Sequence, residues 1–195
     1  MIRPRPRILV FAGSIRTGSH NARLAAQMVQ ALALKDAEPT LLSLGDYAMP
    51  LYDADLEAAS GVPDGARRLA AQMTGHTGIF IASPEYNASV PPLLKNAIDW
   101  VSRIRAGAGE PSPWRGRVYA LGSASPGAFA GIRSLMHLRQ VLELGLGATV
   151  IPEQISVPSA ATAFAGDGGL ADERLAARLE TVASRLIDEA ARYVA

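Results

Sequence analysis

A polar turn that directly follows an apolar run is the part of this sequence best suited to chemistry. The segment Ser83–Arg103, SPEYNASVPPLLKNAIDWVSR, opens with this turn and continues into a helical pattern. In open α/β sheets ligands bind beyond the carboxyl ends of the strands, so the groups of the turn would face a ligand. Tyr86 offers an aromatic face, and Asn87 and Ser89 can form hydrogen bonds. Because Pro84 also fixes the local backbone, the turn predicts a site for a flat ring with polar edges.

A second polar turn, GSIRTGSHN, spans Gly13–Asn21 and leads from the first predicted strand into a helix. The free amides and the positive dipole end of a helix N-terminus favour an anion such as phosphate. Ser14, Ser19 and Asn21 would add neutral donors, and Arg16 would add a charged one. The turn alone also fits a simple N-cap, in which Ser19 only satisfies helix amides.

The spacing within this turn narrows the choice of phosphate ligand. Gly13 and Gly18 match the outer glycines of the P-loop pattern G-x-x-x-x-G-K-[ST], but Ser19 stands where the lysine belongs. The dinucleotide fingerprint G-x-G-x-x-G is also missing. A single terminal phosphate therefore fits better than a nucleoside triphosphate or a pyrophosphate.

A third segment, Gly122–Pro152, follows another predicted strand and opens with small residues. Side chains as small as those of Ser123, Ser125 and Gly127 let backbone amides approach a ligand closely. Taken alone, the segment favours a tight structural turn.

The elements that must position these three turns alternate between strand and helix along the chain, which is typical of a doubly wound parallel sheet. Buried strands are expected at 8–12, 40–44, 78–82, 118–122 and 148–151. Helices are expected at 21–35, 66–73, 132–144 and 171–194, and from the Pro91-Pro92 pair through Val101. The segments 45–64 and 105–115 are expected to be irregular. The pattern predicts one domain, an α/β fold with a five-stranded parallel sheet and helices on both faces.

Composition excludes several classes of protein. Nineteen basic residues against eighteen acidic ones leave a net charge of +1, which gives no basic surface for nucleic acid or an anionic membrane. The chain has no cysteine, and no apolar stretch approaches the roughly 18 residues of a spanning helix. The start, Met1–Arg7, carries two prolines and no secretory pattern, so a cytoplasmic protein is expected.

Other residues give weaker signals. His20, His76 and His137 are too far apart in sequence to suggest a metal pair, although His20 lies in the second turn and could contact a nucleotide. Trp100 could fill the core or an interface between subunits. Lys95 and Asp99 are four apart in the less favourable order for an intrahelical pair, and an intersubunit role is equally open.

The two polar turns together carry a resemblance to a known family. PEYN…LKNAIDW and the loop pattern GSxRxxSxN are similar to signatures of the NAD(P)H-dependent FMN reductases, which have a flavodoxin-like fold. The resemblance covers Ile8 to about Pro158, with departures at Pro126 and at Ala130, where a glycine is common. It implies bound FMN, with contacts to the phosphate from Ser14, Arg16, Ser19 and Asn21, to the isoalloxazine from Pro84, Glu85, Tyr86 and Asn87, and to the ring edge from Ser123 and Ser125. Glu85 is expected to contribute its backbone and to leave its carboxylate in solvent.

The resemblance also implies an activity. NADPH or NADH would pass a hydride to FMN and leave, and a small-molecule acceptor such as free flavin, a quinone, an azo compound or a metal ion would then be reduced in a ping-pong sequence. No catalytic side chain and no resident metal are expected, and a homodimer or homotetramer is implied. The alternatives are a flavodoxin-like electron carrier and a flavin-binding regulatory protein without NAD(P)H turnover.

Overall fold

The computed structural model describes residues 5–104, 112–166 and 168–194 and contains one five-stranded sheet whose strands are all parallel. The strand order is β2-β1-β3-β4-β5. The strands are β1 Arg7–Ala12, β2 Glu38–Ser43, β3 Gly78–Ala82, β4 Val118–Ala124 and β5 Thr149–Val157. The α-helices are α1 His20–Ala33, α2 Ala54–Ser60, α3 Asp64–Thr74, α4 Pro92–Ser102, α5 Ile132–Gln140 and α6 Glu173–Ala190.

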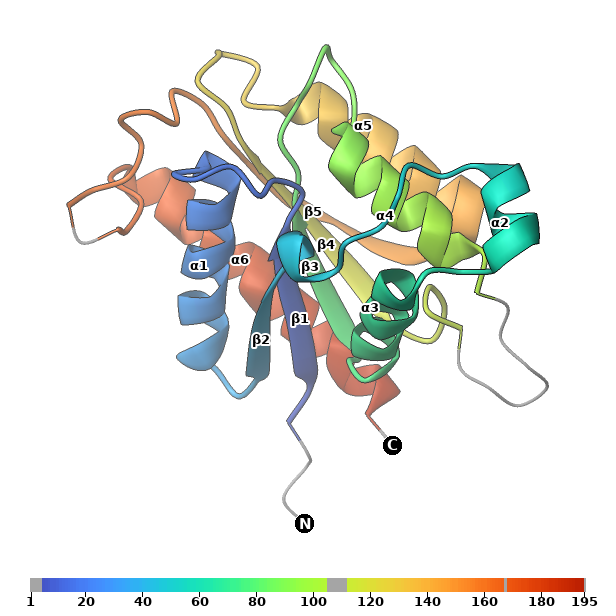
Figure 1. The fold of residues 1–195 in the computed structure, drawn as a ribbon. Helices are drawn as coiled ribbons and strands as arrows, with labels where there is room; N and C mark the ends of the chain where they lie inside the picture. Colours follow the sequence, from blue (N-terminus) through green and yellow to red (C-terminus); the bar gives the residue numbers. More distant parts are fainter. Residues whose placement is uncertain (1–4, 105–111, 167, 195) are drawn as a thin grey trace.

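Helices cover both faces of the sheet, as the continuous apolar runs of the central strands require. On one face Ile8 and Val10 of β1 pack with residues of α1 and α6. On the other face Leu9 and Phe11 pack with residues of α3, α4 and α5. Figure 1 shows α1 and α6 behind and to the left of the sheet, with α3 and α4 in front. The predicted doubly wound α/β architecture is confirmed.

The segment 45–64 differs from its predicted irregular structure. It contains the short helix α2, whose first amides are capped by the Asp53 carboxylate and which ends at Gly61, a glycine with a φ of 72°. A second short helical turn covers Leu44–Asp46. The segment is fastened to α4, because the Trp100 indole and the Asn96 amide both donate to the carbonyl of Pro50 at 2.8 and 2.9 Å.

Two element ends also differ from the expectation. β5 continues past Ile151 through Pro152 to Val157, because it is an edge strand and its register against β4 shifts between Tyr119 and Leu121. Proline is tolerated at such edges and bulges. The α-helical part of α5 stops at Gln140, and Val141–Gly145 forms a π-helical turn. Most of the predicted loop 105–115 lies outside the described residues.

The structure shows the positions of Trp100 and Lys95, two residues of α4 whose roles the sequence left open. Trp100 is fully buried in the core beneath the sheet face that carries α4. The Lys95 ammonium lies 2.6 Å from the Asp99 carboxylate, so these residues form an intrahelical ion pair despite their unfavourable order. Within the described part of the chain, no helix has the length and hydropathy needed to cross a bilayer.

A buried histidine should make stability depend on pH. His76 is 3% exposed, with Nδ1 2.6 Å from the carbonyl of Gln72 and Nε2 3.0 Å from the Thr40 hydroxyl. Burial lowers its pKa below the ordinary value of 6.5, and the charges of Arg7 and Arg117 act in the same direction. The unfolded chain therefore binds this proton more readily, and stability should fall as the pH drops below about 6.5.

Urea denaturation between pH 5 and 8 would measure this dependence. We expect His76→Gln to flatten the slope below pH 6.5. His137→Gln, the same change at an exposed histidine, is the matched control. An equal slope in the wild type and His76→Gln would contradict the prediction.

Candidate functional site

The three predicted turns meet in one hollow at the carboxyl ends of β1, β3 and β4. These strands are neighbours, and the loops that follow them are joined by hydrogen bonds such as Gly13 N to Ala82 O and Ser83 N to Gly122 O, both 2.8 Å. The hollow has a volume of about 150 Å³. It is lined by Ser14, Arg16, Ser19, His20, Asn21, Pro84, Glu85, Tyr86, Ala124, Ser125 and Pro126. Of the predicted site residues, Asn87 and Ser123 do not line it.

The loop after β1 presents the N-terminus of α1 to this hollow. Ser19 is the N-cap, and its hydroxyl accepts a hydrogen bond from the amide of Ala22 at 3.3 Å. The predicted cap is therefore present, yet a serine hydroxyl that accepts a bond still has its proton to donate. Among the described residues, the exposed Arg16 guanidinium binds only the carbonyls of Thr17 and Gly18, both at 3.2 Å. Both side chains are available to an anion.

The first turn of α1 adds two further groups. His20 lines the hollow, and its Nδ1 is buried without a hydrogen-bond partner in the part of the chain that the structure describes. Burial and the charges of Arg16 and Arg23 lower the pKa of His20. The carboxamide of Asn21 binds both backbone groups of Ala124 at 2.9 Å and so fastens α1 to the end of β4. The positive charge of Arg16 and the amides at the N-terminus of α1 suit a phosphate at this end of the hollow.

The turn after β3 is a tight hairpin. Tyr86 and Ser89 exchange backbone hydrogen bonds of 3.1 and 3.0 Å, while Asn87 and Ala88 have φ values of 50° and 63°. Two consecutive residues with positive φ are typical of a type I′ turn, in which asparagine is favoured at the first position. Asn87 therefore shapes the turn, and the ring of Tyr86 is left 48% exposed beside the hollow.

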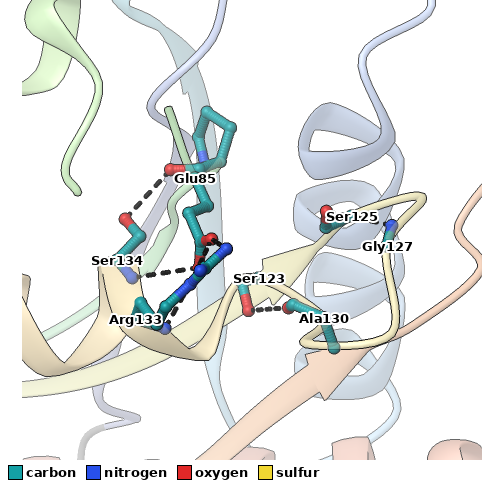
Figure 2. Close-up of polar contacts among 8 residues, drawn as sticks. Glu85, Ser123, Ser125, Gly127, Ala130, Arg133 and Ser134 are labelled. Carbon is teal, nitrogen blue, oxygen red and sulfur yellow. Dashed lines mark hydrogen bonds and ion pairs between the residues drawn. The ribbon is translucent and has the colours of Figure 1, made fainter. Parts of the chain in front are cut away.

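The expectation that the Glu85 carboxylate lies in solvent is wrong. Its Oε1 accepts hydrogen bonds from Nε of Arg133 at 2.7 Å and from Nη2 of the same residue (Figure 2). Its Oε2 accepts hydrogen bonds from the backbone amides of Arg133 and Ser134 at 3.1 and 3.4 Å. The Glu85 side chain is only 7% exposed. Burial alone would raise the pKa of this carboxyl, but the bonds from Arg133 and Ser134 lower it overall.

The loop after β4 is built tightly around Ser123. This hydroxyl is fully buried, 2.5 Å from the carbonyl of Ala130 and 3.2 Å from the hydroxyl of Ser156. Gly131 has a φ of 79°, and a Cβ there would lie 2.8 Å from the Cβ of Ser123. Ser125 lines the hollow, and its hydroxyl accepts from the amide of Gly127 at 3.4 Å. Ser123 thus shapes the loop from inside, while Ser125 faces the hollow.

Ala130 is a strained position in this loop, because its φ of 53° lies in the left-handed region that disfavours any residue with a Cβ. We expect Ala130→Gly to raise the melting temperature and to stabilise the fold by about 1 kcal/mol. Glycine relieves the backbone strain, and this gain is partly offset by the greater entropy that glycine gives the unfolded chain. Thermal unfolding measures the effect. Ala128→Gly is the matched control, since the φ of Ala128 is not positive, and it should not stabilise. A lower melting temperature for Ala130→Gly would disprove the argument.

Residues that the sequence analysis did not assign to the site complete it. Arg133 and Ser134 bind Glu85 from 48 and 49 residues away, and no local sequence pattern links them. Ala124 and Pro126 line the hollow as neighbours of the predicted serines. Among the described residues, no group of three or more His, Asp and Glu side chains is placed to hold a metal ion.

The parallel sheet has the strand order of flavodoxin-like proteins, and the hollow lies at the point between β1 and β3 where the chain changes direction across the sheet. These two features define a flavodoxin-like protein. Donors for a phosphate at one end and an exposed aromatic turn at the other fit a mononucleotide with a flat ring, as FMN is. The sequence model of the family described as NADPH-dependent FMN reductase matches residues 6–162. The chain belongs to this family, and it is an NAD(P)H-dependent oxidoreductase with FMN as its cofactor.

Individual relatives agree with this assignment. A quinone reductase of Escherichia coli (strain K12) is 37% identical over 135 residues, which cover 69% of this chain and 68% of that protein. An NAD(P)H-dependent FMN reductase of Pseudomonas aeruginosa is 32% identical over 168 residues, 86% of each chain. Among solved structures, the flavoenzyme NAD(P)H:(acceptor) oxidoreductase of Paracoccus denitrificans is 30% identical, with a TM-score of 0.78 over 96% of this chain and 98% of that one.

Proposed function

We propose that the chain transfers electrons from NADPH to quinones or free flavins, with FMN held in the hollow between the three loops. The observation that carries the proposal is the convergence of the phosphate-type loop, the Tyr86 turn and the Ser125 loop on one site. Relatives named as quinone reductases and FMN reductases support these acceptors. NADPH is the proposed donor because the family description names it.

Each loop has its own part in this proposal. Ser14, Arg16 and Ser19, with the free amides of α1, hold the phosphate, and Asn21 keeps α1 in place by binding Ala124. Pro84, Glu85, Tyr86 and Asn87 form the turn beside the isoalloxazine, and Ser125 faces the ring edge while Ser123 supports it from below.

The protein's contribution is to bind and orient, since bound FMN accepts and donates the hydride. Glu85 is engaged by Arg133 and by two helix amides, which leaves it unsuited to act as a general base. Backbone amides of the turns offer fixed donors to negative charge on the ring. The exposed Tyr86 ring leaves the turn accessible to flat acceptors such as quinones. On these grounds no side chain of the site is proposed to act as a general acid or base.

Further features complete the proposal. Residues 1–195 are proposed to be a single domain, and the packing of both cores on one sheet supports this proposal. A homodimer or homotetramer is proposed, with the exposed apolar side chains of Phe129, Met136 and Leu144, in and next to α5, as its contact face. The cytoplasm is the proposed compartment, since NADPH is available there.

The test is an anaerobic titration of the purified protein. We expect a flavin absorbance spectrum, present as purified or gained with added FMN, that bleaches with NADPH and returns when a quinone is added. Steady-state NADPH consumption with quinone and free flavin would then identify the acceptor. FMN binding without NADPH consumption would instead support an electron carrier or a regulatory protein, and absence of FMN binding would contradict the proposed site.

A further inference from the structure

Helix α5 begins beside the hollow without a cap from its own sequence. Its N-cap is Gly131, which has no side chain to accept the first helix amides. Such amides need partners from elsewhere when they are not in solvent. Here the partner is Glu85, whose Oε2 accepts from the amides of Arg133 and Ser134 at 3.1 and 3.4 Å. A carboxylate on the loop after β3 therefore caps a helix that follows β4.

A second contact joins the same two segments. The buried Ser134 hydroxyl donates to the carbonyl of Pro84 at 2.9 Å and lies 3.0 Å from the hydroxyl of Ser83. Figure 2 shows Glu85 reaching down from its loop to Arg133 and Ser134 at the start of α5, with the Ser125–Ala130 loop on the other side of Ser123. Since the loop and α5 are continuous in the chain, fixing the start of α5 also fixes the end of the loop.

The charges at this junction are balanced. Arg133 donates two side-chain bonds to Oε1 of Glu85, and its guanidinium lies 4.8 Å from the centroid of the Phe129 ring. Glu85 lines the hollow, whereas Arg133 does not. The negative carboxylate beside the flavin site is thus neutralised by a guanidinium and by the positive end of a helix.

We propose that Glu85 is a positioning residue of the flavin site, which holds the Ser125–Ala130 loop in place by capping α5 and, through Arg133, keeps the charge beside the flavin balanced. The proposal rests on FMN lying in this hollow. Removal of either partner should loosen the loop and weaken FMN binding. The two removals should have opposite effects on charge, because one leaves a cation and the other leaves an anion.

Because the two removals have opposite effects on charge, the reduction potential of bound FMN is the decisive measurement. Reduction adds negative charge to the flavin, so an unpaired positive charge nearby favours it and an unpaired negative charge opposes it. We expect Glu85→Gln to shift the potential in the positive direction and Arg133→Gln to shift it in the negative direction. The double variant, which carries neither charge, should return close to the wild-type potential.

The experiment uses the FMN-loaded protein and first confirms that the wild type binds FMN, which tests the site itself. FMN dissociation constants, redox potentials and melting temperatures are then measured for the variants. Glu85→Ala should raise the dissociation constant about tenfold, and Glu85→Gln should raise it less because the amide oxygen can still accept from the helix.

The matched control is Asp172→Ala. The Asp172 carboxylate caps α6 by accepting from the amides of Arg174 and Leu175 at 2.7 and 3.2 Å, but it does not line the hollow. Its loss should lower the melting temperature and leave FMN affinity and potential unchanged. Two results for Glu85→Gln and Arg133→Gln would show that the proposal is wrong. In the first, both variants lower the melting temperature while FMN affinity and potential stay at wild-type values. In the second, both variants shift the potential in the same direction. Should Glu85→Ala fail to fold, the two glutamine variants decide the question.

Discussion

Replacing Trp100 by alanine should lower the free energy of unfolding by about 3–5 kcal/mol, the range for large aromatic residues removed from a packed core. Trp100 is 0% exposed, and its ring packs edge to face on that of Tyr52 with the centroids 5.0 Å apart. Its Nε1 also donates to the carbonyl of Pro50 at 2.8 Å. The substitution leaves a cavity between α4 and the segment 45–64 and removes one of the bonds that hold the two together.

Trp100→Phe separates the two contributions. Phenylalanine retains most of the apolar contact but cannot donate to Pro50, whose carbonyl still accepts from the Asn96 amide at 2.9 Å. Because no buried acceptor is left without a donor, we expect a loss of only about 1–2 kcal/mol. Urea denaturation with saturating FMN measures both variants. A loss below about 1 kcal/mol for Trp100→Ala would mean that the segment 45–64 can collapse onto α4 without the indole.

Most of the fold could be predicted from local patterns because its signals are local. Ile8–Ala12 and Gly78–Ala82 are continuous apolar runs, and such runs belong to strands covered on both faces. Ser19 stands directly before an amphipathic helix and caps it. The short helix α2 was missed because the segment 45–64 was predicted to be irregular, although Asp53 and Gly61 supply the N-cap and C-cap of a helix there. The predicted strand 148–151 stopped just before Pro152, a residue that the edge strand β5 accommodates.

Most of the residues that line the hollow could be named from the sequence, but their contacts could not. The loop residues that line the hollow follow strand ends, and strand ends of a parallel sheet meet at one edge. The pairing of Glu85 with Arg133 spans 48 residues, and that of Asn21 with Ala124 spans 103. Such pairings depend on how α5 and β4 are placed in three dimensions, which periodicity and motifs do not encode. The sequence therefore named Glu85 but assigned its carboxylate to solvent.

Arg16→Ala should raise the dissociation constant of FMN by about tenfold to a hundredfold and leave that of riboflavin nearly unchanged. The guanidinium lines the phosphate end of the hollow, and charge-assisted bonds to a phosphate are among the strongest that a side chain forms. Riboflavin carries the same ring without the phosphate, so it reports on the ring contacts alone. Fluorescence titration of both flavins gives the two constants, and the advantage of FMN over riboflavin should largely disappear in the variant.

A loss of stability should not account for this result, because Arg16 is exposed and its guanidinium binds the carbonyls of Thr17 and Gly18 within its own loop. Arg23→Ala is the matched control: it removes the same charge from α1, but its guanidinium lies 4.4 Å from the Phe164 ring and does not line the hollow. The FMN affinity of the wild type should also weaken with added salt more steeply than that of Arg16→Ala, since one ion pair with the phosphate is lost. Equal losses of FMN and riboflavin affinity would instead show that Arg16 orders the loop for the ring, and the phosphate would then depend on the amides of α1 and on Ser19.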